Sequence, residues 1–373
     1  SSTIGCTGGI CNVDLGGGLD GIVVNRVVEG SDISITSLGN FTLQATGKLL
    51  TDGRGYGSGL GSGGASSYVL YSSCTTAYSN VGGAGASYGG MGVGSNSLAN
   101  DCSGYGKGSI GPTYGSTKSP ADFGSGGGVG RSYSYDRSGG SGGGKIKVTV
   151  SKALTFVAGS LITSNGVAGV GRYSGYNGCG GGGSGGSVWI IANAIVGSGS
   201  ISANGGDSEA SCGPGGGGRI SVNVQSALPL PSTLAITAYG GARTDLAAAA
   251  GTIYISVSSF SVLLVDNTPR IKDYLASTPF PVELTCKYTA ALQVGYVYVS
   301  PNAWLKLSIT DRALCIGHAY VTSSGVLQIY STAYSGVAAT IFNNSFYHPT
   351  SRPSSQPSGQ PSIQPTSQPS RQP

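Results

Sequence analysis

A phrase made of a glycine run followed by two short alternating segments recurs along the body of this chain. Within it, Ile146, Val148 and Val150 alternate with Lys147 and Thr149, and the same alternation returns in each copy. The copies occupy 32–53, 141–165, 183–204 and 215–239, and a further one opens at 250–257. Alternation with a period of two is typical of β-strands. Each copy therefore predicts a pair of strands.

The spacing of the copies predicts how these strands are arranged. From Val188 to Ile220 the step is 32 residues, and from Ile220 to Ile253 it is 33. Self-similarity at such a period is the sequence signature of a solenoid. We expect an all-β, right-handed parallel β-helix over 1–265, with Ile220 and Val222 facing inward. A β-sandwich is the alternative, but a sandwich needs no internal repeat.

Two long glycine-rich insertions interrupt the repeat, at 53–144 and 166–187. Loops of this length without regular structure are either functional or disordered. The alternatives are a flexible tract and an ordered plate clamped by Cys74–Cys102, and we favour the plate, whose tyrosines would contact a neighbouring subunit. The insertions hold 11 of the 21 tyrosines: Tyr56, Tyr68, Tyr71, Tyr78, Tyr88, Tyr105, Tyr114, Tyr133, Tyr135, Tyr173 and Tyr176.

From 266 to 348 the glycine content falls and strand-like alternation returns. Val294, Tyr296 and Tyr298 fall on one face of the expected strand, and further alternating segments follow near 304 and 326. This stretch predicts a second β region, either as additional coils or as a small cap.

The tail at 349–373 contains five copies of the tetrapeptide P-[ST]-x-Q, starting at Pro353. Proline at every fourth position favours an extended polyproline-II chain, which at about 3.1 Å per residue would reach roughly 65 Å over 353–373. A disordered linker is the alternative, but we expect the tail to take part in an assembly. Hydroxyls beside prolines are typical of O-glycosylated stalks, which makes Ser354, Ser358, Ser362, Thr366 and Ser370 candidate glycosylation sites.

Eight cysteines, with no CxxC pair, indicate disulfides rather than a zinc or redox site. Because neighbouring cysteines bracket one loop or one pair of segments, we predict the pairs Cys6–Cys11, Cys74–Cys102, Cys179–Cys212 and Cys286–Cys315. Asn40 and Asn343 lie in N-x-[ST] sequons and are candidate N-glycosylation sites. With Met91 as the only methionine, we interpret Ser1 as an N-terminus left by removal of a signal peptide. Together these features predict an extracellular protein.

Composition argues against an enzyme, because charged residues make up 9% of the chain and histidines number two. Arg270-Ile271-Lys272 and Gly317-His318-Ala319 faintly resemble polygalacturonase motifs, but their order is wrong and the paired aspartates are missing. His318 is better interpreted as structural. No phosphate-binding loop occurs, and Asp207 alone does not make a calcium repeat. We therefore predict no catalytic residue, no cofactor and no metal.

The net charge of +5 is not concentrated in any run, which argues against nucleic acid as a partner. No apolar stretch approaches the roughly 18 residues of a membrane span.

The phrase GGGSGGSVWI…GSISANGG…GGGGRISV and the P-[ST]-x-Q tail resemble secreted glycine-rich glycoproteins of heterokont algae, a group that includes proteins of tubular flagellar hairs (mastigonemes). The resemblance covers about 140–260 and 353–373. It implies an extracellular, glycosylated filament or surface component without catalytic activity. Mastigoneme-type proteins usually also carry EGF-like cysteine modules, which do not occur in this sequence.

We therefore expect a structural glycoprotein that forms homopolymeric filaments and carries covalent glycans. Its tyrosine-rich loops and tail would join one subunit to the next. The alternative is a carbohydrate-binding or adhesive surface module, in which the tyrosines face sugar.

Overall fold

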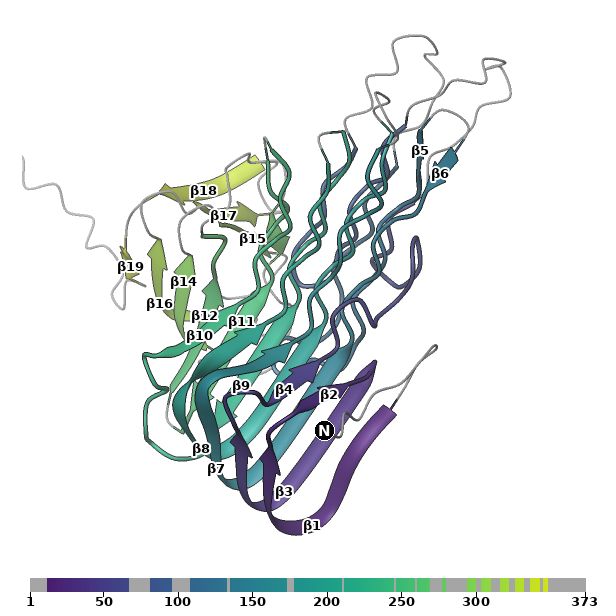
Figure 1. Ribbon diagram of the computed structural model, residues 1–373. Helices are drawn as coiled ribbons and strands as arrows, with labels where there is room; N and C mark the ends of the chain where they lie inside the picture. The colour runs from purple at the N-terminus through teal and green to yellow at the C-terminus, as the bar shows by residue number, and fades with distance from the viewer. Residues whose placement is uncertain are drawn as a thin grey trace, which may run out of the picture.

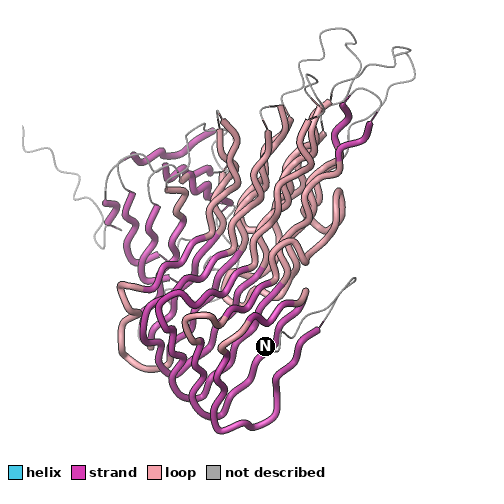
Figure 2. The backbone as a smooth tube through the Cα atoms, viewed as in Figure 1, coloured by secondary structure: helices cyan, strands magenta, loops and turns pink. Residues whose placement is uncertain are grey.

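The computed structural model is all-β, and the residues that it describes form strands and no helix (Figures 1 and 2). No helix long and apolar enough to cross a membrane therefore occurs among them. The all-β prediction is confirmed. The structure describes residues 12–66, 81–95, 108–132, 135–172, 178–209, 211–244, 246–258, 260–268, 277–279, 294–299, 303–309, 316–321, 326–331, 336–342 and 345–347.

The repeated phrase forms two parallel ladders that stack successive copies side by side (Figure 1). One ladder joins β1 (Asn12–Val24), β3 (Asp32–Leu43), β7 (Lys145–Thr163), β8 (Ser187–Ser202), β9 (Arg219–Val224) and β11 (Thr252–Val257). The other joins β2 (Val27–Glu29), β4 (Lys48–Leu50), the end of β7, the end of β8 and β10 (Leu234–Thr237). The long strands β7 and β8 bend between the ladders, where their pairing shifts register.

The register places equivalent positions of the phrase beside one another. Ile33 pairs with Ile146, Ile146 with Val188, Val188 with Ile220, and Ile220 with Ile253. All five side chains are at most 1% exposed. Burying each of them contributes roughly 1.5–3 kcal/mol, so the inward row is a main source of stability. The parallel pairing and the inward positions that alternation predicted are confirmed.

The bends between the ladders close over the same core. Phe41, Leu154 and Ile195 are successive partners at the bend, and all are buried. In the copy at 32–53, Leu43 and Leu49 join the core, and Leu50 does not, because β4 turns its middle residue inward.

The glycine-rich segments leave the ladders and run side by side as a bundle of extended chains, drawn in pink in Figure 2. The bundle has little regular strand, apart from the short antiparallel pair β5 (Gly130–Ser132) and β6 (Tyr135–Arg137). Where they are described, the insertions at 53–144 and 166–187 are hydrogen-bonded to each other. Their described parts form an ordered bundle, while the expected clamp Cys74–Cys102 lies outside the described residues.

The sheet reverses direction at β12 (Phe260–Val265), inside the 1–265 segment that was expected to be parallel throughout and before the expected second β region begins. β12 pairs antiparallel with β11 after a turn in which Ser258 has a φ of 30°. β14 (Val294–Val299) and β16 (Ile316–Val321) then continue the sheet in parallel with β12. On β12 and β14, the buried residues Leu263, Val265, Val297 and Val299 lie on the face opposite Leu264, which packs against the first core. Near this junction the shared sheet therefore buries one face fully and the other in part.

A second sheet accompanies these strands. It contains β13 (Thr278–Pro279), β15 (Trp304–Ile309), β17 (Val326–Ser331) and β18 (Gly336–Phe342). The last strands, β18 and β19 (Ser345–Tyr347), pair antiparallel with β17 and β16 and reverse the direction in both sheets. The strands predicted near 294, 304 and 326 are confirmed.

Inward Ile220 offers a test of this register. We expect Ile220→Asp to prevent folding, because an unpaired buried charge costs several kcal/mol. The matched variant Asn223→Asp lies on the same strand with its side chain partly exposed and loses only the hydrogen bond from Nδ2 to Oγ of Ser221, so it should lower the melting temperature far less. The two variants are compared by circular dichroism and thermal unfolding. Equal melting temperatures would contradict the inward assignment.

Candidate functional site: a hydrogen-bonded glycine bundle

The segment 179–186 lies inside the bundle. Its successive N–H groups donate hydrogen bonds to three neighbouring segments in a repeating order. Every third N–H group reaches the same neighbour, with N···O distances of 2.8–3.0 Å. Gly180, Gly183 and Gly186 donate to 164–170, Gly181 and Ser184 donate to 125–128, and Gly182 and Gly185 donate to 213–216. N–H groups three residues apart point to the same side, so the backbone of this segment has three residues per turn. Its hydrogen bonds all go to other segments, as in the extended polyproline-II conformation.

The carbonyl groups of the same segment accept hydrogen bonds from three other neighbours. Cys179 and Gly182 accept from 83–86, Gly181 and Ser184 accept from 140–143, and Gly183 accepts from Gly206. Segment 179–186 is thus bonded to six surrounding segments. Residues 213–218 continue the pattern, because Gly213 and Gly216 donate to 83–86 while Gly215 and Gly218 donate to 203–206.

Glycine is needed here because the backbones touch. A Cβ atom on Gly181 would lie 1.9 Å from the carbonyl oxygen of Ala84, and one on Gly183 would lie 2.1 Å from that of Ser141. Real Cβ atoms do not approach backbone this closely. None of the glycines at 180–186 has a positive φ. The requirement is therefore for space, and not for the left-handed conformation that glycine usually supplies.

A ladder of polar side chains lies where successive copies of the phrase pass from the sheet into the bundle. The Oδ1 atom of Asp52 accepts from the N–H of Asn165 at 2.6 Å, Oδ1 of Asn165 accepts from Asn204 at 2.7 Å, and Oδ1 of Asn204 accepts from Tyr239 at 2.8 Å. Each residue of the ladder precedes a glycine and ends one copy of the phrase. The recurring step of Asp or Asn followed by Gly is the sequence pattern from which this ladder could have been predicted.

Tyr88 and Arg219 fasten the bundle to the sheet. Tyr88 is fully buried, and its hydroxyl lies 2.6 Å from Oγ of Ser187, the first residue of β8. The Arg219 guanidinium lies 5.6 Å from the centre of the Tyr88 ring, within reach of a cation–π interaction. Arg219 also donates to the carbonyl of Tyr114 at 2.8 Å and to Oγ1 of Thr117 at 2.6 Å.

The tyrosines of the insertions have different environments. Tyr88 and Tyr114 pack against each other with ring centres 4.6 Å apart, and the Tyr114 hydroxyl lies 2.7 Å from Oγ of Ser125. These two rings therefore make contacts within the chain. Tyr56 and Tyr135 are 39% and 54% exposed. The others, Tyr68, Tyr71, Tyr78, Tyr105, Tyr133, Tyr173 and Tyr176, lie outside the described residues.

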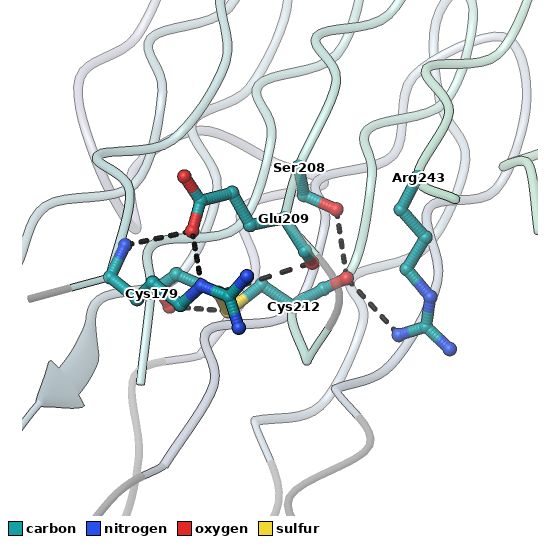
Figure 3. Close-up of a disulfide and its surroundings, with 6 residues drawn as sticks. Cys179, Ser208, Glu209, Cys212 and Arg243 are labelled. Carbon is teal, nitrogen blue, oxygen red and sulfur yellow. Dashed lines mark hydrogen bonds and ion pairs between the residues drawn. A yellow bond between two sulfur atoms is a disulfide. The ribbon is translucent and has the colours of Figure 1, made fainter. Parts of the chain in front are cut away.

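The disulfide Cys179–Cys212 joins two adjacent extended segments of the bundle, as predicted (Figure 3). Its Cα atoms are 5.9 Å apart, and both cysteines are buried. The carbonyl of Cys212 accepts from Oγ of Ser208 at 2.8 Å and from the buried guanidinium of Arg243 at 3.2 Å. The bond holds the end of segment 179–186 against segment 211–218. The predicted pairs of Cys6, Cys11, Cys74, Cys102, Cys286 and Cys315 lie outside the described residues.

Of the candidate glycosylation sites, only Asn40 lies among the described residues. It is exposed at the bend of β3, and its Oδ1 accepts from the N–H of Ala153 at 3.2 Å, which leaves Nδ2, the atom that carries an N-linked glycan, outside this bond. Asn343, Ser354, Ser358, Ser362, Thr366 and Ser370 lie outside the described part of the chain, as does the whole repeat tail.

The described residues contain no group of three or more His, Cys, Asp or Glu side chains placed to hold a metal ion. No protein-family model, no curated protein and no solved structure matches the chain.

The bundle can be tested with a pair of glycine substitutions. We expect Gly181→Ala to destabilise the protein by at least about 1–3 kcal/mol, because its Cβ would meet a backbone carbonyl that cannot move alone. Gly57→Ala is the control, since nothing lies within 4 Å of a Cβ there. Chemical denaturation of the two variants gives the difference in free energy of unfolding. Equal values for the two variants would contradict the backbone contact.

A second test uses pH. Burial raises the pKa of Tyr88 to about 12, although nearby Arg219 acts in the opposite direction. The folded state therefore favours the neutral phenol. Its contribution to stability is complete below pH 10 and is lost as pH rises toward 12, by about 1.4 kcal/mol per unit.

The variant Tyr88→Phe isolates this contribution. Burial also raises the pKa of Tyr114, so alkaline destabilisation should persist in the variant but with a shallower slope. The measurement is the free energy of unfolding of both proteins between pH 9 and 12, and parallel curves would contradict the assignment to Tyr88.

Proposed function

We propose that this chain is an extracellular structural glycoprotein that assembles with copies of itself into filaments or fibrils, of the cell-surface or flagellar-hair type. The observation that carries the proposal is the glycine bundle, in which segment 179–186 is hydrogen-bonded to six neighbouring segments. Its interior has room for backbone and for almost nothing else. Such an interior provides stiffness rather than side-chain chemistry.

The bundle resists bending for a physical reason. Segments 179–186 and 213–218 are each hydrogen-bonded to the same neighbour at intervals of three residues. Shifting one such segment therefore breaks hydrogen bonds to several others at once. A buried polar backbone group left without its partner costs roughly 1–3 kcal/mol. Local deformation is therefore opposed by many small penalties together, as expected for a component under mechanical load.

For the body we propose a right-handed parallel β-helix. Equivalent residues of successive copies pair in parallel and bury the same side chains, which supports a coiled path of the chain. The right hand follows from the general preference of parallel crossovers. In this arrangement 1–265 forms the body, 266–348 ends it, and 349–373 extends beyond it.

Subunit contacts are assigned to the tail and to the tyrosine-rich loops. The exposed rings of Tyr56 and Tyr135 support the second part of this assignment, since half-exposed tyrosines supply a large contact area at low cost in conformational entropy. The buried disulfide and the exposed sequon at Asn40 support an oxidising, secretory route.

The experiment is a deletion of residues 353–373. The expected result is a truncated protein that keeps its melting temperature, because the core formed by the described residues is retained, but no longer forms the filaments that the full chain forms in electron microscopy. In parallel, the intact mass of the secreted full chain should exceed that of its polypeptide through glycans on the tail hydroxyls. Identical filaments from the truncated protein would overturn the role of the tail.

A further inference from the structure

Three tyrosines gather on the partly exposed face of β14 and β16. On β14, Tyr296 and Tyr298 alternate with the buried residues Val297 and Val299, so their side chains lie on the opposite face of the sheet. Tyr320 of β16 pairs directly with Tyr298 in the parallel register. Adjacent strands are about 4.8 Å apart, which brings the two side chains together.

The rings of these tyrosines are nearly parallel. The Tyr298 and Tyr320 ring centres are 4.9 Å apart with an angle of 13° between their planes. The Tyr296 ring lies 6.4 Å from each of the other two. Tyr298 is 38% exposed, so a reagent in solution can reach the cluster.

We propose that this cluster is a site of oxidative cross-linking, at which Tyr298 and Tyr320 become joined as dityrosine. The oxidant is hydrogen peroxide acting through a haem peroxidase. Peroxide takes one hydrogen atom from each phenol and leaves as two water molecules. The two radicals then form one carbon–carbon bond between the ring positions next to the hydroxyls, and the hydrogens displaced from these carbons return to the two oxygens.

A second pair of tyrosines in the same chain shows that coupling requires exposure of the rings as well as a short distance between them. Tyr88 and Tyr114 are even closer, at 4.6 Å, but Tyr88 is fully buried. Their hydroxyls are hydrogen-bonded to Ser187 and Ser125. The coupling product needs its rings edge to edge, which requires side-chain rotation. The half-exposed Tyr298 can rotate into solvent, whereas Tyr88 cannot.

The consequence is a covalent bond between β14 and β16. These strands belong to the second β region, whose described residues include no cysteine. A dityrosine bond would hold two strands of this sheet together where the described disulfide, Cys179–Cys212, does not reach.

The test treats the purified full-length monomer, at high dilution, with a haem peroxidase and hydrogen peroxide. Dityrosine is detected by its fluorescence, and proteolytic peptides are analysed by mass spectrometry. The expected product is one linked pair of peptides that contains Tyr298 and Tyr320 and has lost two hydrogen atoms.

Two variants sharpen the result. Tyr320→Phe keeps the ring stack but should lose all coupling between β14 and β16, whereas Tyr114→Phe should leave the Tyr298–Tyr320 product unchanged. The proposal fails if exposed Tyr135 is oxidised while no Tyr298–Tyr320 product forms, or if the Tyr88–Tyr114 pair couples equally well. Because the reaction needs a monomer only, its failure is independent of filament assembly.

Discussion

Contact of backbone with backbone in the glycine bundle is the constraint on which the rest of the structure depends. A Cβ on Gly181 or Gly183 would overlap a neighbouring carbonyl, so the bundle must be built almost without side chains. It then buries little apolar surface, and each hydrogen bond contributes only about 0.5–1.5 kcal/mol net. Glycine also loses more conformational entropy on folding than any other residue. The bundle therefore needs stability from elsewhere.

The strands of the parallel sheet provide that stability, because the chain alternates between the two kinds of packing. Each copy of the phrase contributes side chains such as Ile33, Ile146 and Ile220 to a common apolar core and is joined to a glycine segment of the bundle. The ladder from Asp52 through Asn165 to Asn204 fixes the positions at which these segments leave the sheet. Parallel pairing in the sheet thus places the glycine segments side by side, where they are hydrogen-bonded to one another.

Comparison of sequence and structure separates local from non-local information. The inward positions were predictable from alternation, and the pair Cys179–Cys212 was predictable because it brackets one loop. The glycine bundle was not predictable from the sequence, because a run of glycines has no side-chain periodicity that indicates which segments lie beside it. Tyr88 and Tyr114 were expected to face another subunit, yet their rings pack against each other inside the chain, and Tyr88 is hydrogen-bonded to Ser187, 99 positions away.

The sequence by itself therefore determined that the described residues form an all-β structure and which residues of the repeated strands face inward, since alternation along a strand is a property of consecutive residues. Only the tertiary structure decided that the glycine segments join in a bundle, that 179–186 has six neighbours, and which tyrosines are buried or exposed. Those outcomes depend on which distant segments meet. Because glycine offers only a backbone, identical at every position, that choice is made by the side chains of the strands that flank the segments.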